Sequence, residues 1–334
     1  MLKILGDLCF SDGYFDMGVG IGTSIKTGRD PFEYLNRDKN DFWIGNFECV
    51  CADSPDSNFI ITPHVLDNVK HLDLYGVANN HSMQIGETGY CQTLDYLKER
   101  GIKYAGSDNQ RSTIFNHQNK KIGLLAFSMR PDNFSSQPLY WHLPEIYDIT
   151  KEIDKLDKCD FKIAFIHWGY EFINRPNIEQ RQLAHCLVDT GIDLVVGMHP
   201  HVAQGAEIYK GKSIFYSLGN ALFNMPWSPT KYGLMVNVDL VEEEAKIWTD
   251  YIFIGDDYFP RVVDRVPELY SKEYLDKQVL ITEENEKYFK SASKFNNNYT
   301  KANRRAILRR LLSMPWNEKI KLIQDFTNRR ILKK

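Results

Sequence analysis

Residues 191–201 read Gly-Ile-Asp-Leu-Val-Val-Gly-Met-His-Pro-His, a short apolar run that leads into two histidines separated by one proline. An apolar run of this length with turn signals after it is typical of a buried strand. His199 and His201 would then follow the end of a strand, and Pro200 restricts the backbone between them. Two imidazoles in that arrangement lie near one centre and suit a metal site.

The same pattern of a short apolar run followed by a turn recurs along the first two hundred residues. The predicted strands are Leu2–Leu5, Phe42–Gly45, Leu72–Ala78, Ile122–Phe127, Phe161–Ile166 and Ile192–Val196. Helical segments separate some of them, with apolar residues at helical spacing and a glycine at the end: Glu87–Arg100 and Asn177–Asp189. Strands that alternate with helices predict an α/β layered domain.

Polar side chains that suit metals follow five of these predicted strands. They are Asp7, Glu48, Asn80 with His81, His167, and His199 with His201. Ligands bind at the carboxyl ends of strands in open α/β sheets, so these residues are expected to converge. Imidazole and carboxylate together suit Zn, Fe or Mn. We therefore predict a centre for one or two divalent transition-metal ions that hydrolyses its substrate, with Asp7 or Glu48 as a bridging carboxylate.

Each of these residues also has an ordinary structural interpretation. An aspartate after a strand is usually a turn former or a helix cap, and Asn79-Asn80-His81 would serve as a polar turn. The combination favours a metal centre, because turn formation does not select histidine at three strand ends. The remaining histidines do not follow strands and are interpreted as surface or core residues: His64, His71, His117, His142 and His185.

Five motifs occur in the order found in a known family. They are Gly6-Asp7, Asn46-Phe47-Glu48, Ala78-Asn79-Asn80-His81, His167-Trp168-Gly169-Tyr170-Glu171, and the segment from Gly191 through His199-Pro200-His201 to Ser217-Leu218-Gly219-Asn220. In these motifs the chain resembles the CapA family, the capsule and poly-γ-glutamate synthesis proteins, over about residues 1–240. The resemblance implies a four-layer calcineurin-like metallophosphoesterase sandwich, two β-sheets flanked by helices.

The resemblance also implies a role for individual residues. Asp7, Glu48, Asn80, His167, His199 and His201 match the metal ligands of the family. The resemblance implies that His81 and Glu171 are catalytic residues, with His81 as the acid or the phosphate-contacting group. Ser217, Asn220 and Cys9 are expected to support the ligands. The chain departs from the family pattern in three places: Cys9 replaces a histidine, Gln84 a carboxylate, and Met198 a histidine. These departures leave open whether one ion binds or two.

The function expected from this resemblance is metal-dependent hydrolysis in the synthesis of a capsule, poly-γ-glutamate or another surface polymer. The bond cut would be a phosphoester or a γ-glutamyl amide. The alternative is a non-catalytic accessory subunit of a polymer synthase that keeps a residual metal site. A serine hydrolase using Ser217 or Ser11 is a weak third hypothesis, because neither lies in a Gly-x-Ser-x-Gly turn.

After residue 205 the alternation of strands and helices gives way to successive strands and then to a basic helical region. Strands are predicted at Ser213–Leu218, Gly233–Leu240 and Ala245–Ile254, with antiparallel pairing expected. We divide the chain into a CapA-like metallophosphatase domain, residues 1–270, as the resemblance implies, and a basic helical C-terminal extension, residues 271–334. Within the extension, Asn296–Asn298 is predicted as a loop, and Asn303–Leu312 and Asn317–Lys334 as amphipathic helices. These helices either pack on the domain or bind a membrane surface or a membrane-associated synthase complex.

Bulk composition excludes several other classes. A chain of 334 residues with 43% hydrophobic and 25% charged residues is an ordinary globular protein. The net charge of -3 gives no reason to expect nucleic-acid binding by the chain as a whole. The six cysteines lack zinc-finger spacing, and no secretory leader or membrane-spanning segment is recognised. The expected location is the cytoplasm, at the membrane periphery if the tail binds there.

Overall fold

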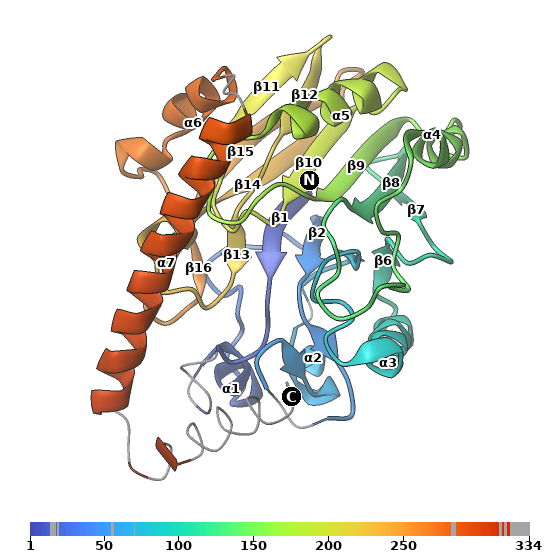
Figure 1. Cartoon of the computed structure of the whole chain (residues 1–334). Coiled ribbons are helices and arrows are strands. Elements are labelled where there is room, and N and C mark those ends of the chain that lie inside the picture. The colour runs from blue at the N-terminus through green and yellow to red at the C-terminus, as the bar shows by residue number, and fades with distance from the viewer. Residues whose placement is uncertain are drawn as a thin grey trace.

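A computed structural model describes residues 1–13, 18, 20–54, 57–69, 71–281, 285–313, 316 and 319–320. Two β-sheets form the centre of the molecule (Figure 1). The larger sheet has the order β16-β15-β14-β1-β2-β5-β6, with β13 paired to β1. Its strands are β1 (Leu2–Leu8), β2 (Phe42–Phe47), β5 (Leu74–Gly76), β6 (Lys103–Ala105), β13 (Asn220–Leu222), β14 (Tyr232–Asp239), β15 (Lys246–Ile254) and β16 (Pro260–Val263).

The second sheet has the order β11-β12-β10-β9-β8-β7. Its strands are β7 (Ser112–His117), β8 (Lys120–Ser128), β9 (Phe161–His167), β10 (Leu194–Met198), β11 (Ala206–Tyr209) and β12 (Lys212–Phe215). A short parallel pair, β3 (Val50–Cys51) and β4 (Ile60–Ile61), lies apart from both sheets. The central strands of each sheet run parallel, so β1, β2 and β5 end on one edge, as do β9 and β10.

Helices cover the outer face of each sheet. Helices α1 (Ile21–Lys26), α2 (Pro63–Asp67) and α3 (Gly86–Glu99) pack on the larger sheet. Helices α4 (Ile146–Asp154) and α5 (Ile178–Asp189) pack on the second sheet. The remaining helical segments are η1 (Ser228–Lys231), η2 (Glu268–Tyr270), α6 (Lys272–Val279) and α7 (Asn285–Ser313).

Apolar side chains that alternate between the two faces of each strand hold these four layers together. In β1, Leu2 and Ile4 enter the core between the two sheets, whereas Leu5 enters the core under the helices. In β8, Leu124 faces the other sheet and Leu125 faces α4 and α5. Successive side chains on a strand point to opposite faces, so each strand serves two cores. The arrangement confirms the predicted sandwich of two sheets flanked by helices.

The predicted elements are largely confirmed, with two corrections. The strand expected at Ser213–Leu218 is β12, which ends at Phe215; it pairs antiparallel with β11, as expected, and also parallel with β10, which was not expected. The loop expected at Asn296–Asn298 is wrong, because these residues lie inside α7. The rings of Phe295 and Tyr299 on either side contact Trp227. This packing outweighs the weak helix propensity of asparagine.

The extension is helical where it is described. Helix α6 packs into the body through Leu275 and Val279, and α7 runs along one flank (Figure 1). The helix predicted at Asn303–Leu312 is the last part of α7, whereas most of Asn317–Lys334 lies outside the described residues. Among the described helices, none combines the length and apolar character needed to cross a bilayer. The domain boundary at residue 270 stays a prediction.

Candidate metal centre

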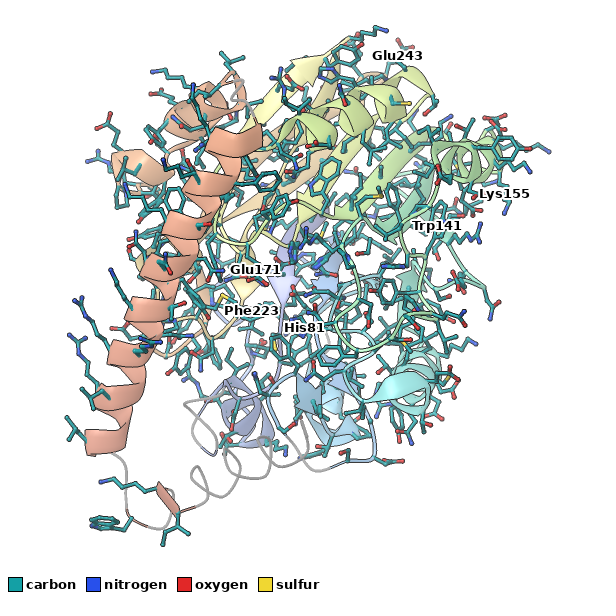
Figure 2. The ribbon with its side chains drawn as sticks, in the orientation of Figure 1. His81, Trp141, Lys155, Glu171, Phe223 and Glu243 are labelled. Atoms are coloured by element: carbon teal, nitrogen blue, oxygen red, sulfur yellow. The ribbon has the colours of Figure 1, made fainter. Side chains whose placement is uncertain are left out.

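The metal ligands predicted from the sequence converge from both sheets. Asp7 lies near the end of β1, Glu48 directly follows β2, and Asn80 lies in the turn between β5 and α3. The second sheet contributes His167, which ends β9, together with His199 and His201 after β10. All six side chains are buried. Figure 2 shows His81, Glu171 and Phe223 around the same end of the strands.

The two carboxylates, Asp7 and Glu48, lie close together in the buried cluster. Asp7 Oδ1 accepts a hydrogen bond from Asn46 Nδ2 at 2.8 Å, and Oδ2 accepts one from the His199 backbone N–H at 3.2 Å. Burial raises the pKa of Asp7 to about 6, although these hydrogen bonds oppose the shift. Burial and the negative charge of Asp7 together hold the pKa of Glu48 well above its ordinary value. Such a pair requires a proton or a bound cation.

The three histidines are held in the neutral form that metals bind. Burial lowers the pKa of His167 and His199 well below the ordinary value, and that of His201 to about 3. His201 Nδ1 is 2.9 Å from Asn220 Oδ1, so Nδ1 carries the proton and Nε2 presents its lone pair. This Nε2 lies 3.5 Å from Glu48 Oε1. The centre therefore offers neutral imidazole donors next to carboxylates.

Several atoms of the centre that could bind a metal have no hydrogen-bond partner among the described residues. They are both ring nitrogens of His199 and Oε1 of Glu48. Buried polar atoms normally have a partner, so an unpartnered set gathered in one cluster fits a bound metal ion. Two groups of side chains bring their donor atoms within 4.8 Å of one another: Glu48 with His199 and His201, and Asp7 with Glu48 and His167. Glu48 belongs to both groups, so the residues present would fit one ion or two.

The backbone around the histidine pair adopts uncommon conformations. His199 has φ of 93° and His201 has φ of 57°, both in the left-handed region. Residues other than glycine occupy this region only where the surroundings hold them. The Asp7 carboxylate holds the N–H of His199, and the carbonyl of Pro200 accepts a 2.7 Å hydrogen bond from the Phe172 N–H. The turn thus aims both rings at the centre at a conformational cost.

Two glycines allow the strands to approach closely enough to form the centre. A Cβ atom at Gly6 would lie 1.9 Å from the carbonyl oxygen of Gly219. That same carbonyl accepts a 3.0 Å hydrogen bond from the Asp7 N–H. Gly219 itself has φ of 68°. The close contact of these two backbones sets Asp7 beside Asn220 and thereby beside His201.

Asn46 and Asn79 are the members of this cluster that the sequence interpretation missed. Asn46 Nδ2 lies 2.8 Å from Asp7 Oδ1, 3.3 Å from Glu48 Oε2 and 3.3 Å from His167 Nδ1. Its Oδ1 accepts a hydrogen bond from Asn79 Nδ2 at 3.2 Å. A signal was present, since Asn46 and Glu48 are two positions apart and so share one side of an extended chain.

The predicted amide ligand and the substrate-side histidine lie next to each other. Asn80 Oδ1 is 2.7 Å from His167 Nε2. The His81 ring stacks on Phe59 at 3.6 Å between centroids, and its Nδ1 lies 3.1 Å from Gln84 Oε1. Burial lowers the pKa of His81 to about 4. Gln84 thus orients the ring through the position at which the family pattern has a carboxylate.

Other predicted residues surround the centre. Phe134, from the loop 131–144, lies 6.2 Å from the His81 ring. The surrounding protein shields the Glu171 carboxyl from water and so raises its pKa, whereas the positive charge of Arg130 lowers it. The Ser217 hydroxyl donates to the Val202 carbonyl at 2.9 Å, so it serves the backbone of the histidine turn.

Cys9 takes the place of the histidine expected in the family pattern. Its Sγ lies 3.2 Å from Ser11 Oγ, and it belongs to neither group of potential ligands found among the described residues. Burial raises the pKa of the Cys9 thiol, but hydrogen bonds from Cys49 and Ser11 outweigh that effect and the pKa lies below its ordinary value. The histidines set aside earlier have other contacts, such as His71 with Asp30 and His185 with Glu207.

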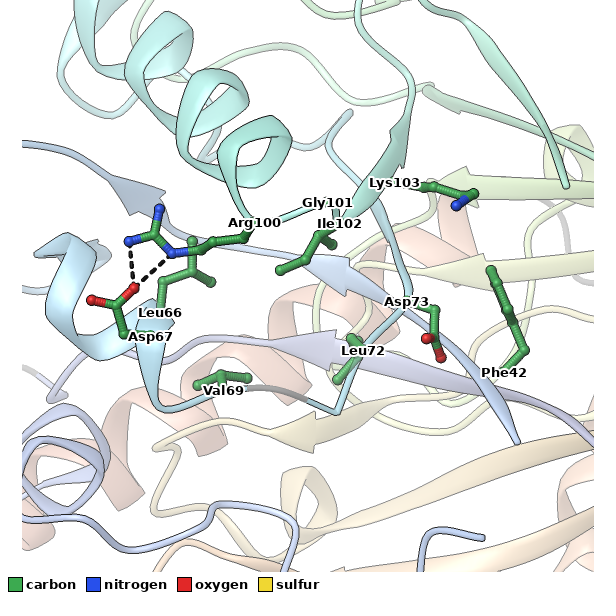
Figure 3. A pocket seen from close by; sticks show the side chains of 10 residues that line it. All are labelled: Phe42, Leu66, Asp67, Val69, Leu72, Asp73, Arg100, Gly101, Ile102 and Lys103. Carbon is green, nitrogen blue, oxygen red and sulfur yellow. Dashed lines mark hydrogen bonds and ion pairs between the residues drawn. The ribbon is translucent and has the colours of Figure 1, made fainter. Parts of the chain in front are cut away.

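Two hollows lie outside the cluster of ligands. One of about 490 Å³ opens at the other end of the larger sheet, near the starts of β5 and β6, and Asp67 and Arg100 pair at its edge (Figure 3). A smaller one of about 250 Å³ is apolar and is lined in part by Phe172, Trp227 and Phe295. The smaller hollow borders the rim of the centre, because the Phe172 ring lies 6.2 Å from that of His201.

Comparison with known proteins gives a consistent set of relatives. Residues 5–225 match the family described as "Bacterial capsule synthesis protein PGA_cap", a range that includes every predicted ligand. The chain is 33% identical over 188 residues to "Capsule biosynthesis protein CapA" of Bacillus anthracis, covering 51% of this chain and 45% of that protein. It is 34% identical over 176 residues to "PGA biosynthesis protein CapA" of Bacillus subtilis (strain 168), covering 49% and 46%. The chain thus spans about half the length of the curated relatives it matches.

Solved structures give a weaker likeness. A phosphatase from Mycoplasma pneumoniae superposes with a TM-score of 0.48 at 14% identity, over 75% of this chain and 92% of that one. A 5'-nucleotidase from Candida albicans superposes with a TM-score of 0.45 at 12% identity, over 90% and 58%. Scores of this size do not bear on the chemistry of the centre.

Proposed function

Because the chain belongs to the family of bacterial capsule synthesis proteins, PGA_cap, we propose that its buried carboxylate–histidine cluster is a metal centre that hydrolyses a bond in a surface polymer or its precursor. One observation carries this proposal. The unpartnered nitrogens of His199 and the unpartnered Oε1 of Glu48 are buried in the same cluster as a second carboxylate and two further histidines.

For one ion the proposed ligands are Glu48, His199 and His201. For a second ion they are Asp7, Glu48 and His167, with Asn80, which lies beside His167, as an additional ligand. A divalent Mn, Zn or Fe ion bound there would act as a Lewis acid and make a water molecule more acidic. The protein supplies fixed ligands, since Asn46 and Asn220 hold their orientations. Burial of the cluster excludes bulk water and strengthens every charge interaction inside it.

His81 and Glu171 are the proposed substrate-side residues. The Gln84 oxygen opposite Nδ1 requires that this nitrogen carry the proton, so the neutral His81 ring presents Nε2 as an acceptor. An anionic substrate oxygen next to the ring would raise its pKa. The protonated ring would then stabilise developing charge or give its proton to the leaving group.

The proposed substrate is a phosphoester or a γ-glutamyl amide, in small-molecule or polymer form. The names of the Bacillus relatives connect those proteins with capsule and PGA biosynthesis, which supports a polymer or its precursor as the substrate here. Association with a membrane-bound synthase complex through the basic helices is a further part of this proposal.

Two measurements test the centre directly. Protein purified without chelator should contain one or two equivalents of transition metal by elemental analysis. The double variant His199→Ala/His201→Ala should lose both the metal and any turnover of an aryl phosphate or a γ-glutamyl peptide. The control is His185→Ala, which removes a histidine that pairs with Glu207 outside the ligand cluster. A folded wild-type protein that binds no metal after incubation with Mn, Zn or Fe would refute the proposal.

The second candidate is an accessory subunit without catalysis. A relative in Mycobacterium tuberculosis, 28% identical over 166 residues, is described as a "Probable polyglutamine synthesis accessory protein". That alternative is supported if the wild-type protein binds metal but cleaves neither substrate class with any of the three metals. Cleavage that depends on His199 and His201 would exclude it.

A further inference from the structure

Helix α7 presents two faces with different chemistry, and its inner face is anchored beside the metal centre. Tyr288 donates from its hydroxyl to the Arg175 carbonyl at 3.3 Å, and Arg175 donates to Ser291 Oγ at 3.2 Å. Farther along, the Tyr299 ring stacks on Phe172 at 4.0 Å. Phe172 in turn contacts the His201 ring, so α7 forms part of the rim of the centre.

The outer face of α7 carries a row of positive side chains, here called the cationic stripe. Its members are Lys287, Lys290, Lys294, Lys301, Arg304 and Arg305. They recur at three, four or seven positions, so they share one side of the helix. All six are exposed, and no ion pair joins any of them to the described part of the chain. At 1.5 Å per residue the stripe is about 27 Å long.

Charge is strongly segregated between α7 and the rest of the molecule. Helix α7 contains eight Lys and Arg residues and one Glu, a net charge of 8 − 1 = +7. The whole chain has a net charge of -3, so the remaining residues carry −3 − 7 = −10. Positive charge gathered on one exposed face of an acidic molecule raises the local concentration of anions there. The family match ends at residue 225 and does not include this helix.

We infer that the cationic stripe binds a linear anionic polymer, a polycarboxylate, and holds it beside the metal centre. The inference rests on the proposed function for the class of polymer. The shape of the stripe fits an extended chain, since its charges form a single row. The apolar residues Leu308 and Leu312 follow the stripe and do not interrupt it. A helix that lies in a bilayer surface instead carries an apolar face along its whole length.

The test measures binding rather than turnover. Labelled poly-glutamate is titrated with the full chain and followed by fluorescence anisotropy at several salt concentrations. The stripe variant is Lys290→Gln/Lys294→Gln/Lys301→Gln/Arg304→Gln. Each exposed ion pair contributes a factor of about two to three, so loss of four should weaken binding about 30-fold. Wild-type binding should also weaken as salt rises.

The matched control removes four exposed lysines elsewhere: Lys39→Gln/Lys98→Gln/Lys158→Gln/Lys277→Gln. Both variants have the same net charge, so the control should bind within about twofold of wild type if position matters. Equal weakening in the two variants overturns the inference, as does failure of the wild-type chain to bind. Binding that is at least as tight to single-stranded DNA, or to phosphatidylcholine vesicles with one-third phosphatidylserine, also overturns it.

The variant His199→Ala/His201→Ala separates this inference from the proposed hydrolysis. It keeps the cationic stripe, so its affinity for poly-glutamate should equal that of wild type even though metal binding is lost. If the wild type binds the polymer but hydrolyses nothing, the inference about the cationic stripe is supported and the proposed hydrolysis is refuted. If it hydrolyses a substrate but does not bind polymer at the stripe, the proposed hydrolysis is supported and the inference about the stripe is refuted.

Discussion

Substitution of Asn46 by alanine should weaken metal binding without unfolding the protein. Asn46 is 2% exposed, and its Nδ2 lies 2.8 Å from Asp7 Oδ1 and 3.3 Å from both Glu48 Oε2 and His167 Nδ1. It is therefore a common partner of three proposed ligands. Alanine removes all of these contacts and leaves the strand backbone unchanged.

The expected loss follows from what such partners contribute in other metal sites. Removal of a residue that orients the ligands typically lowers metal affinity about 10- to 100-fold, which is about 1.4 to 2.7 kcal/mol. The metal-free protein should lose about 1 to 3 kcal/mol of unfolding free energy, because a buried hydrogen-bond network loses one member. Asn79 Nδ2 keeps its 2.8 Å bond to the Phe47 carbonyl, so that side chain stays partly satisfied.

Competition titration with a chelator measures the affinity, and denaturant unfolding of the metal-free protein measures stability. Asn237→Ala is the matched control, since Asn237 is 1% exposed and donates a 2.9 Å hydrogen bond to Asp250 within the same sheet. It should lose stability but keep its metal affinity. An Asn46→Ala protein with wild-type affinity, or an equal loss of affinity in the control, would refute the reasoning.

Gly6→Ala should cost at least about 3 kcal/mol of unfolding free energy, because the new Cβ would lie 1.9 Å from the Gly219 carbonyl oxygen. Gly211→Ala, at φ of 78° with open space around it, should cost only about 1 kcal/mol in the same denaturation assay. Metal affinity measured by calorimetry should fall as pH drops below about 6, because the ion must displace a proton from Asp7, whose pKa is raised to about 6; an affinity independent of pH between 5 and 7.5 would contradict this. Tyr299→Ala should speed hydrogen exchange in α7, because the ring stack beside the centre is lost; unchanged exchange there would show that this stack does not hold the helix.

The candidate site was accessible from sequence because its residues follow recognisable strands. Apolar runs locate buried strands locally, and a polar residue just past such a run lies at a strand end whatever the partner strand is. Asp7, His167 and His199 were found in this way. Asn46 was harder to identify: its position two residues before Glu48 was a signal, but its contacts with Asp7 and His167 come from other strands and are not visible in the sequence.

The pairing of strands, and the structure of segments whose packing overrides their local composition, were harder to predict from the sequence. The segment Ser213–Leu218 was correctly expected to form a strand with antiparallel pairing, which it makes with β11, but its parallel pairing with β10 is set by packing between distant segments. Asn296–Asn298 has the composition of a loop, yet it is helical because Phe295 and Tyr299 pack against Trp227. In both cases, contacts between residues far apart in the chain decided the outcome, and local propensity did not.

By itself, the sequence determined the α/β class, the positions of the main strands and the chemical types of the candidate ligands, since each depends on periodicity or on one residue's own chemistry. Only the tertiary structure decided that Asp7 and Glu48 come from one sheet and His167 and His199 from the other. It also decided that the ring nitrogens of His199 have no hydrogen-bond partner among the described residues and that α7 turns its cations outward. These properties depend on distances and burial, which arise only when segments far apart in the chain pack together.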